Sequence, residues 1–573
     1  MTKAFSLHAV WQRLSCERLN DTLFLTAISI APALFYVSSL GFYLDDYYFL
    51  GLMSTDKHQS LTSLYDTIVS EDPKAQLRPL VYVGIAGLYL LFGTNPLPYQ
   101  IVLVVEIAVC TVLLYVVLSH LRLPRFLALG VPLLFAAAPH YSSDRFWPIA
   151  YSLTLSLILY LVSLYTGLRA LETRGVRVAA WLGLSAASML MSAFMYEVPL
   201  PLFVLNGVLF WYRSRRLHAS RQFLPLAYGS VLVLAIVVKL VQAIKVGGET
   251  SYHLGYESGF LHHVAYLVSG GIKVNFGTYG VGLPYVVWWI FANRFSWLVL
   301  AASLLVGVAT FLYLRRAVDG RALSAVAADE RRLPDWRAIC AAGVVLLVAA
   351  YASFLITGSI YFTSAGIDNR VNIVAALGIA VLTVGLLLGA AHFLPARRRA
   401  TALAAGVAVL SAVGILVTNT LATFWASAYD RQKQVLGRLH SALPSEKSDS
   451  TVVVDGVCPE VGPGVVFAAH YDLAGALKTA YRDRTLDGLF TTPTVRVGRD
   501  GVTISTRLFE QIEPHFYPYR RRLILYDWRR GTSHRLTGPA QARRYLAATP
   551  RLSCPPLRSF VWGIHTSRWV PFA

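Results

Sequence analysis

The chain has 573 residues, of which 14% are charged and 55% are hydrophobic, and its mean hydropathy is +0.53. Soluble domains carry about 25% charged residues, so this composition excludes an ordinary soluble enzyme. Lys and Arg exceed Asp and Glu by 51 − 31 = 20. Because the apolar residues come in blocks of roughly 20, the length of a membrane-spanning helix, we expect much of this excess in cytoplasmic loops and no nucleic-acid partner.

Eleven apolar segments are predicted to cross the membrane. The first, 22–44, follows basic residues as a signal anchor does. It is longer than the apolar core of a signal peptide, and no small-residue cleavage site separates it from Asp45, so we expect a cytoplasmic N-terminus. In chain order the eleven segments are 22–44, 99–119, 126–141, 148–168, 179–197, 198–212, 223–244, 293–314, 338–358, 371–393 and 401–425.

The charges of the connecting loops test this count independently. Every loop that the count places in the cytoplasm is rich in arginine, as orientation requires, namely 122–125, 169–177, 213–221, 315–337 and 397–399. The apolar stretch 79–92 would invert this pattern if it crossed the bilayer, so we place it on the outer surface as an amphipathic or re-entrant helix. The external face then receives the loop 41–98, several short connections and everything after about residue 426.

Residues 1–425 are thus predicted to form a transmembrane domain and residues 426–573 a second, extracytoplasmic domain. In the second region, short β-prone runs such as 451–455 and 522–526 alternate with Gly and Pro turns, which is typical of a small α+β domain. Cys458 and Cys554 are the two cysteines of five predicted to face an oxidising compartment, so we expect a disulfide between them. Runs of arginine make this region basic. They form either a solvated face or a surface that binds anionic glycan or lipid headgroups.

Two adjacent acids, Asp45 and Asp46, follow the first segment among aromatic residues. Carboxylates so close together repel, which raises one pKa and suits a general base near neutral pH or a divalent cation. The alternative is that the acids end a helix while the tyrosines form an interfacial belt. Arg78 next opens the outer helix at Pro79, where an interfacial anchor is equally consistent with the pattern.

This order of motifs resembles the C-type membrane glycosyltransferases (GT-C), and more narrowly the protein O-mannosyltransferase and lipid A aminoarabinose transferase branch. In that family the first external loop carries an acidic pair whose first member is generally the catalytic base. The resemblance implies this role for Asp45, with Asp46 second. It covers residues 20–210 well and 360–390 moderately, and the C-terminal domain not at all.

Further positions fit the same resemblance. His140, Asp144 and Arg145 lie in a turn where the family has external polar residues. Glu197 resembles the acid of the family's Lys-Glu junction, although Tyr196 stands in place of the Lys. Arg370 stands where the family often has an Arg at the outer mouth of a late span, followed here by Val rather than the more usual Tyr.

The resemblance implies a polyprenyl-phosphate sugar as donor, with Asp45 taking the acceptor's proton. External arginines would stabilise the leaving phosphate, with Arg78, Arg145 and Arg370 as candidates. For each, the alternative is an arginine that snorkels or binds phospholipid. Glu106, inside the second segment, either shapes the donor site or is a hydrogen-bonded structural acid. Apart from the possible cation at Asp45 and Asp46, the spacings indicate no metal site and no nucleotide-binding or serine-hydrolase motif.

The sequence therefore predicts an α-helical, polytopic, GT-C-like protein of the bacterial plasma (inner) membrane with a small α+β domain. Its predicted function is the transfer of a hexosyl or pentosyl unit from a polyprenyl-phosphate donor to an envelope glycan, lipid or protein acceptor at the outer, periplasmic face of the membrane. The alternative is a transporter or non-catalytic scaffold of envelope polysaccharide assembly, whose acids would lie along a path within the spans. Most of the distinctive acids instead fall at one membrane face.

Overall fold

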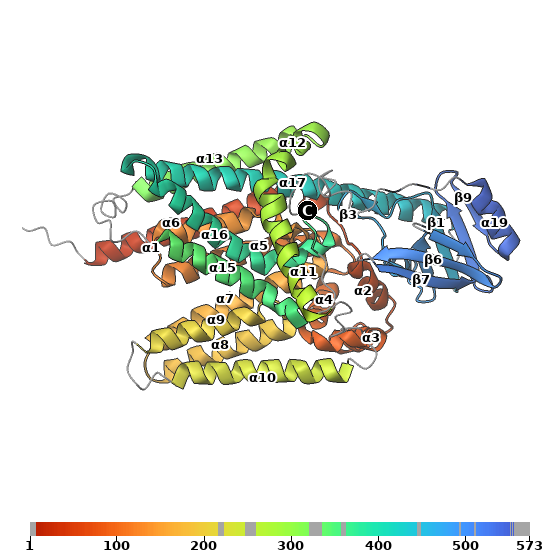
Figure 1. The fold of residues 1–573 in the computed structure, drawn as a ribbon. Helices are drawn as coiled ribbons and strands as arrows, with labels where there is room; N and C mark the ends of the chain where they lie inside the picture. The colour runs from red at the N-terminus through yellow and green to blue at the C-terminus, as the bar shows by residue number, and fades with distance from the viewer. Residues whose placement is uncertain are drawn as a thin grey trace, which may run out of the picture.

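The computed structural model describes residues 7–215, 223–246, 259–319, 335–356, 362–443, 449–491, 494–508, 511–549, 552 and 554. Figure 1 shows a bundle of long helices with a smaller domain that contains the strands at one end. The helices of the bundle are α1 (Leu7–Ile30), α2 (Asp45–Ser54), α3 (Leu61–Glu71), α4 (Pro79–Phe92), α5 (Pro96–His120), α6 (Arg125–Ala137), α7 (Tyr151–Glu172), α8 (Val176–Met195), α9 (Leu200–Ser214), α10 (Phe223–Val246), α11 (Phe260–Ile272), α12 (Leu283–Asn293), α13 (Trp297–Asp319), α15 (Trp336–Ala352), α16 (Ile373–His392) and α17 (Ala396–Ala442).

Short helical segments join several of these helices. They are η1 (Ala31–Phe35), η2 (Val37–Ser39), η3 (Pro73–Leu77), η4 (Pro139–Arg145), η5 (Pro148–Ala150), the π-helical η7 (Lys273–Val281), η9 (Ser353–Ile356) and η10 (Ile367–Asn372). Two of them, η4 and η10, contact each other between the long helices. Both segments carry buried polar side chains, such as Ser143 of η4 and Asn369 of η10. The regular apolar helices around them contribute mainly hydrophobic side chains.

Within the described residues, nine helical segments are long and apolar enough to cross a membrane, and the pair α6 and η4, bent by 63°, would make a tenth. The described parts of all eleven predicted segments contain helices, and the sixth segment is shorter than the nine helical segments counted above. Its helix, α9, has 15 residues. At about 1.5 Å per residue it extends about 22 Å, less than the roughly 30 Å hydrocarbon core, so it would cross where the bilayer is locally thinned. The apolar stretch 79–92 is the separate 14-residue helix α4, which is set apart from the spanning helices by its length.

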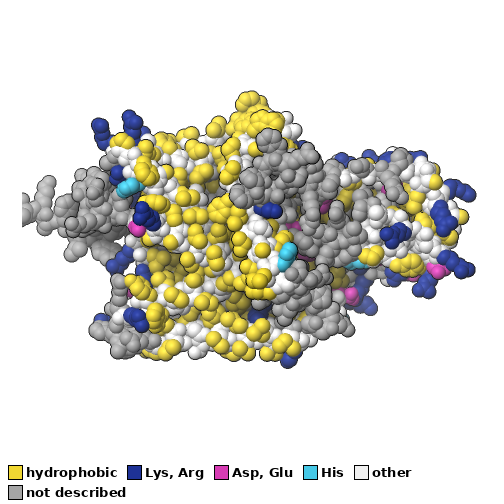
Figure 2. Space-filling model, in the orientation of Figure 1, with side chains coloured by type: hydrophobic (Ala, Val, Ile, Leu, Met, Phe, Trp, Pro, Cys, Tyr) yellow, Lys and Arg dark blue, Asp and Glu magenta, His cyan; other side chains and the backbone are white. Residues whose placement is uncertain are grey.

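The outside of the bundle is apolar, as a lipid-facing surface requires. Large side chains such as Leu226, Leu305 and Val348 are exposed on α10, α13 and α15. Figure 2 shows hydrophobic side chains over most of the bundle's visible face, whereas Lys and Arg side chains gather at its left end and on the strand-containing domain at the right. This distribution matches a polytopic membrane protein with basic residues at both aqueous ends.

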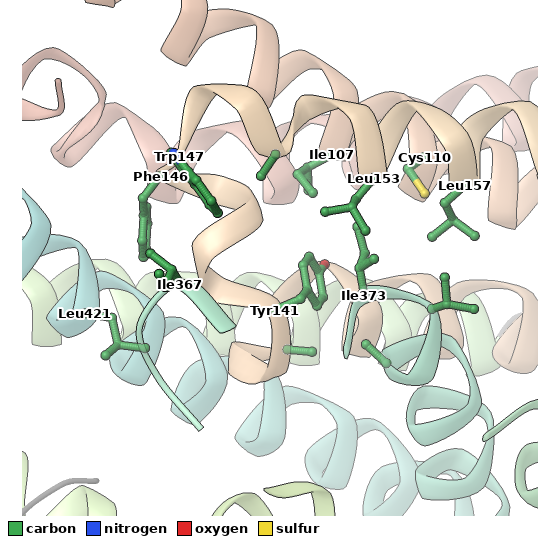
Figure 3. Packing of buried hydrophobic residues seen from close by; sticks show 14 of the residues in the cluster. Ile107, Cys110, Tyr141, Phe146, Trp147, Leu153, Leu157, Ile367, Ile373 and Leu421 are labelled. Carbon is green, nitrogen blue, oxygen red and sulfur yellow. The ribbon is translucent and has the colours of Figure 1, made fainter. Parts of the chain in front are cut away.

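The core of the bundle forms around η4. Tyr141, Phe146 and Trp147 are at most 1% exposed. Figure 3 shows these aromatic side chains among Ile107 of α5, Leu153 of α7 and Ile373 of α16. Close packing of large side chains from distant parts of the sequence fixes where η4 passes through the bundle.

The strand-containing part, which we call the tail domain, begins with β1 at Ser450, and α17 continues as a helix past the end of its apolar stretch to Ala442. Its main sheet has the order β4-β1-β8-β9. The predicted strand runs 451–455 and 522–526 form β1 and β8, which pair in parallel with Val453 opposite Leu525. The bounds are β1 (Ser450–Asp455), β4 (Asp487–Phe490), β8 (Arg522–Asp527) and, antiparallel to β8, β9 (Thr532–Arg535).

The remaining elements complete a small α+β domain. An antiparallel sheet contains β5 (Thr494–Val497), β6 (Gly501–Leu508) and β7 (Gln511–Pro518), and a short ladder contains β2 (Glu460–Val461) and β3 (Gly464–Val465). The helices are α18 (Asp472–Tyr481) and α19 (Pro539–Ala548). A disulfide joins Cys458 to Cys554, with a Cα–Cα distance of 5.6 Å, so it ties the start of the domain to its end.

Candidate active site

A sharp turn at Leu44 places the acidic pair at the start of α2. Leu44 has a φ of 47° and a ψ of −114°, a positive-φ conformation that costs a non-glycine residue about 1–3 kcal/mol. The preceding loop is held from other elements: the Trp147 indole donates to the Tyr43 carbonyl at 2.9 Å, and the Gln100 amide donates to the Gly41 carbonyl at 2.9 Å. Such strain persists only where surrounding contacts fix the backbone, and it is common at functional sites.

Asp46 is 1% exposed and is held entirely by backbone groups. One of its carboxylate oxygens accepts from the Tyr43 amide and the other from the Ile149 amide, both at 2.9 Å. Through these two bonds Asp46 fastens the loop to the segment before α7, and a contact of Asp46 with an acceptor, a cation or an arginine stays a prediction.

Asp45 lies next to it but remains partly exposed. Its Oδ1 accepts a hydrogen bond of 2.6 Å from the Tyr471 hydroxyl of the tail domain. Burial raises the pKa of Asp45, the hydrogen bond from Tyr471 and the charge of Arg370 lower it, and the charge of Asp72 raises it. The net upward direction suits a carboxylate that accepts a proton near neutral pH.

Arg370 reaches this site from η10. Its guanidinium lies over the Trp147 ring, 4.7 Å from the ring centroid. Neighbouring Asn369 anchors η10 to η4, because its Oδ1 accepts from the Ser143 amide at 3.0 Å and its Nδ2 donates to the Ser142 hydroxyl at 2.7 Å. These bonds between η4 and η10 hold the backbone next to Arg370 in place. The charge of Arg370 lowers the pKa of Asp45 from this position.

A second group of charges forms beside it at the junction of α8 and α9. Arg78 donates to both carboxylate oxygens of Glu197, through Nε at 3.0 Å and through a second guanidinium nitrogen. The Arg78 guanidinium also lies 3.8 Å from the centroid of the Tyr196 ring. Lys239 Nζ lies 3.8 Å from the Glu197 Oε2. Although burial opposes ionisation, Arg78 and Lys239 together lower the pKa of Glu197 to about 2, so the carboxylate is ionised at physiological pH.

Lys239 is a site residue that the sequence reasoning missed. It is the one charged residue within the predicted span 223–244. A charge inside a membrane span is costly and usually marks a functional or paired position, so the signal was present. Tyr471 and Gln100 were also missed, and neither has a comparable local signal.

The other predicted site residues, His140, Asp144, Arg145 and Glu106, are buried within the bundle. Arg145 is 6% exposed and donates to the Ala136 carbonyl at 2.6 Å and to the Tyr141 hydroxyl at 2.8 Å. The His140 ring packs 4.8 Å from the Tyr279 ring. Asp144 and Glu106 are buried, at 0% and 8% exposure, and Arg370 and Arg145 act electrostatically on Asp144. Arg370, one of the three arginines proposed to bind phosphate, lowers the pKa of Asp45 through its charge.

The described residues contain no group of three or more His, Cys, Asp or Glu side chains arranged to hold a metal ion. Because both Asp46 oxygens accept backbone hydrogen bonds, a cation would have to rely mainly on Asp45. The divalent cation therefore stays a prediction. An open polar depression of about 810 Å³ lies along α3, but Asp45, Glu197 and Arg370 do not line it.

No protein-family model matches the chain, and no curated protein sequence matches it. Two solved structures of ArnT from Cupriavidus metallidurans are similar to it. The structure with undecaprenyl phosphate bound has a TM-score of 0.38 and 13% sequence identity, over 83% of this chain and 89% of that chain. The apo structure has a TM-score of 0.35 and 13% identity, over 85% of this chain and 86% of that chain.

Proposed function

We propose that this membrane protein is a glycosyltransferase that moves a monosaccharide from a polyprenyl-phosphate donor to an envelope glycan, lipid or protein. The observation that carries the proposal is the environment of Asp45. A partly exposed carboxylate with a raised pKa, on which the charge of Arg370 acts, lies at the end of the bundle where the helices meet the tail domain. A lipid-linked donor can approach such a position from the bilayer, and a polar acceptor can approach it from water.

The two charged groups have complementary roles in this reaction. Asp45 accepts the proton of the acceptor's nucleophilic group as a bond forms to the anomeric carbon. The bond from that carbon to the donor's phosphate oxygen breaks with its electron pair going to the phosphate. Arg370 stabilises the added charge by charge-assisted hydrogen bonds, and inversion at the anomeric carbon follows from the direct displacement. Arg78 is engaged by Glu197, so we assign it to holding the α8–α9 junction.

The proposal includes an orientation. The nine long helical segments of the described residues, the bent pair α6 and η4, and the shorter helix α9 together make eleven crossings. With the N-terminus in the cytoplasm, the site and the tail domain lie outside the bacterial inner membrane after this odd number of crossings. Support comes from the arginine-rich connections, such as Arg169 to Arg177 between α7 and α8, which fall at the end of the bundle away from the tail domain. An alkaline phosphatase fusion placed after residue 549 should be active, and activity of only a cytoplasmic fluorescent fusion would overturn the orientation.

The decisive experiment is a transfer assay with the purified full chain. Isotope-labelled polyprenyl-phosphate hexoses and pentoses are incubated with the protein and envelope extract, and label is followed into the acceptor fraction. We expect transfer from one donor, and a rate about 10²- to 10⁴-fold lower in the Asp45→Asn variant. Movement of intact lipid-linked sugar across proteoliposomes without covalent transfer would favour the transporter alternative. Chelation by EDTA, followed by return of Mg²⁺ or Mn²⁺, tests whether Asp45 works with a cation.

A further inference from the structure

The tail domain reaches directly into the proposed site through Tyr471. The Tyr471 hydroxyl donates to Asp45 Oδ1 at 2.6 Å, although the two residues are 426 positions apart in the sequence. A hydrogen bond to a carboxylate stabilises its ionised form and restricts its rotation. The contact is therefore able to set both the direction and the ionisation of Asp45.

The helices that carry the two residues are packed too closely for this contact to be incidental. A Cβ on Gly475 of α18 would lie 2.1 Å from the Tyr47 carbonyl oxygen, and a Cβ on Gly51 of α2 would lie 2.7 Å from Gly475 Cα. Such distances exclude any side chain larger than hydrogen at these points. Glycines on both helices thus let α18 lie against α2 and bring Tyr471 to Asp45.

The turn that presents Tyr471 is also fixed. Asp472, which is fully buried, accepts through Oδ2 from the Ala468 and Ala469 amides at 2.6 and 3.0 Å. The Tyr471 ring packs against the Tyr48 ring of α2, with ring centroids 5.3 Å apart. On the other side the His470 ring contacts it at 5.0 Å and stacks on His515 of β7 at 3.8 Å. The hydroxyl group of Tyr471 is held in place before any substrate arrives.

We propose that Tyr471 is a positioning residue for the transfer reaction, so that the tail domain is a working part of the active site. This inference rests on the proposed role of Asp45 as the general base. By holding Oδ1, Tyr471 directs the second oxygen of Asp45 toward the acceptor and keeps the carboxylate ionised at a lower pH than its buried position alone would allow.

Other charged and titratable groups also act on Asp45 or are acted on by it. They are Arg370 of η10, Asp72 before η3, Asp46 and Tyr48 of α2, and Asp472 of α18. Removal of the Tyr471 hydroxyl leaves all of these unchanged. Any change in the titration of Asp45 can then be assigned to the lost hydrogen bond.

The test compares Tyr471→Phe with Tyr481→Phe in the full chain. Tyr481 lies on the same helix, and its hydroxyl donates to the Leu443 carbonyl at 3.2 Å, so its variant is a matched loss of one tyrosine hydroxyl. Asp45 is labelled by carbodiimide and an amine at a series of pH values, and mass spectrometry gives the labelling midpoint. Tyr471→Phe should raise this midpoint by about one pH unit, while Tyr481→Phe leaves it unchanged.

In the transfer assay, Tyr471→Phe should shift the acidic limb of the kcat/KM profile upward by the same amount, with recovery at higher pH. A merely structural role predicts equal loss at every pH. Replacement of Tyr471 by 3-fluorotyrosine keeps the side-chain shape but strengthens the donor, so it should lower the midpoint even if the Phe variant does not fold. An unchanged Asp45 midpoint in these variants overturns the inference. A fully active Asp45→Asn variant would instead overturn the proposed function, whatever the labelling shows.

Discussion

Asp45 and Asp46 are chemically identical neighbours, but their surroundings differ, so the same substitution should have different consequences. Asp45→Asn keeps an oxygen for Tyr471 yet cannot accept a proton, and we expect transfer to fall about 10²- to 10⁴-fold with the fold retained. In Asp46→Asn, one backbone amide would face a donor NH₂ group, which should destabilise the protein by about 1–3 kcal/mol. Transfer rates and thermal unfolding in detergent are measured on both variants to separate the two roles. Equal turnover by wild type and Asp45→Asn would contradict the role of Asp45 as the general base.

Glu197 provides a pH-dependent contribution to stability. Its folded pKa of about 2 is below the ordinary 4.5, so the stabilisation is fully present above pH 4.5 and is lost as the pH falls toward 2. Glu197→Gln removes the carboxylate's charge opposite Arg78 and Lys239 and should destabilise the protein by about 1–3 kcal/mol at pH 7. Denaturant unfolding in detergent should show the difference from wild type shrinking between pH 4.5 and 2. A difference independent of pH would contradict this.

Arg370 should act on the donor rather than on folding. Arg370→Lys keeps the positive charge but loses the planar fork and its contact with the Trp147 ring. We expect a higher KM for the donor and a lower kcat, with a larger loss in Arg370→Ala. The measurement is steady-state transfer at several donor concentrations, and wild-type kinetics in both variants would assign Arg370 to anchoring.

At the scale of elements, the contact between α2 and α18 depends on Gly475. Gly475→Ala would bring a Cβ against the Tyr47 carbonyl, a backbone atom that cannot rotate away. We expect the tail domain to shift and transfer to fall at least 10-fold, as small misplacements at an active site do. Gly437→Ala, at a helical position with no neighbour within 4 Å, is the control and should be neutral or slightly stabilising. Equal activity of the two variants would show that the close approach is not needed.

The elements also show what the sequence reveals and what it leaves hidden. Hydropathy predicts the helices of the bundle because a helix that contacts lipid needs a long run of apolar residues. The end of such a run predicts where the chain leaves the membrane, and the helix itself can continue beyond that point. Hydropathy therefore missed the continuation of α17 to Ala442. The position of Asp45 followed from its place after the first span. Tyr471 could not be found in this way, because its role depends on packing between α2 and α18, which no local pattern encodes.

At the scale of the whole molecule, the disulfide between Cys458 and Cys554 closes a loop spanning 96 positions of the tail domain. By the chain-entropy model, such a loop contributes up to about 4–5 kcal/mol. Reduction should lower the unfolding temperature of the tail domain while the bundle keeps its helicity. Limited proteolysis and circular dichroism with and without reductant check this, and identical protease resistance in both states would contradict it.

The continuous helix α17 has a consequence for how the two parts of the molecule can evolve. It has 47 residues, and near its end Gln432 donates to the Val466 carbonyl at 2.8 Å, so the tail domain turns with the helix. An α-helix advances by about 100° and 1.5 Å per residue. One residue inserted between Trp425 and Gln432 would therefore rotate the tail domain by about 100°, and four would nearly restore the angle but lift it by about 6 Å. Tyr471 contacts Asp45 only if α17 has a length that gives the tail domain both the correct rotation about the helix axis and the correct distance along it. We therefore expect no insertions or deletions in this stretch, even at positions where single substitutions are tolerated.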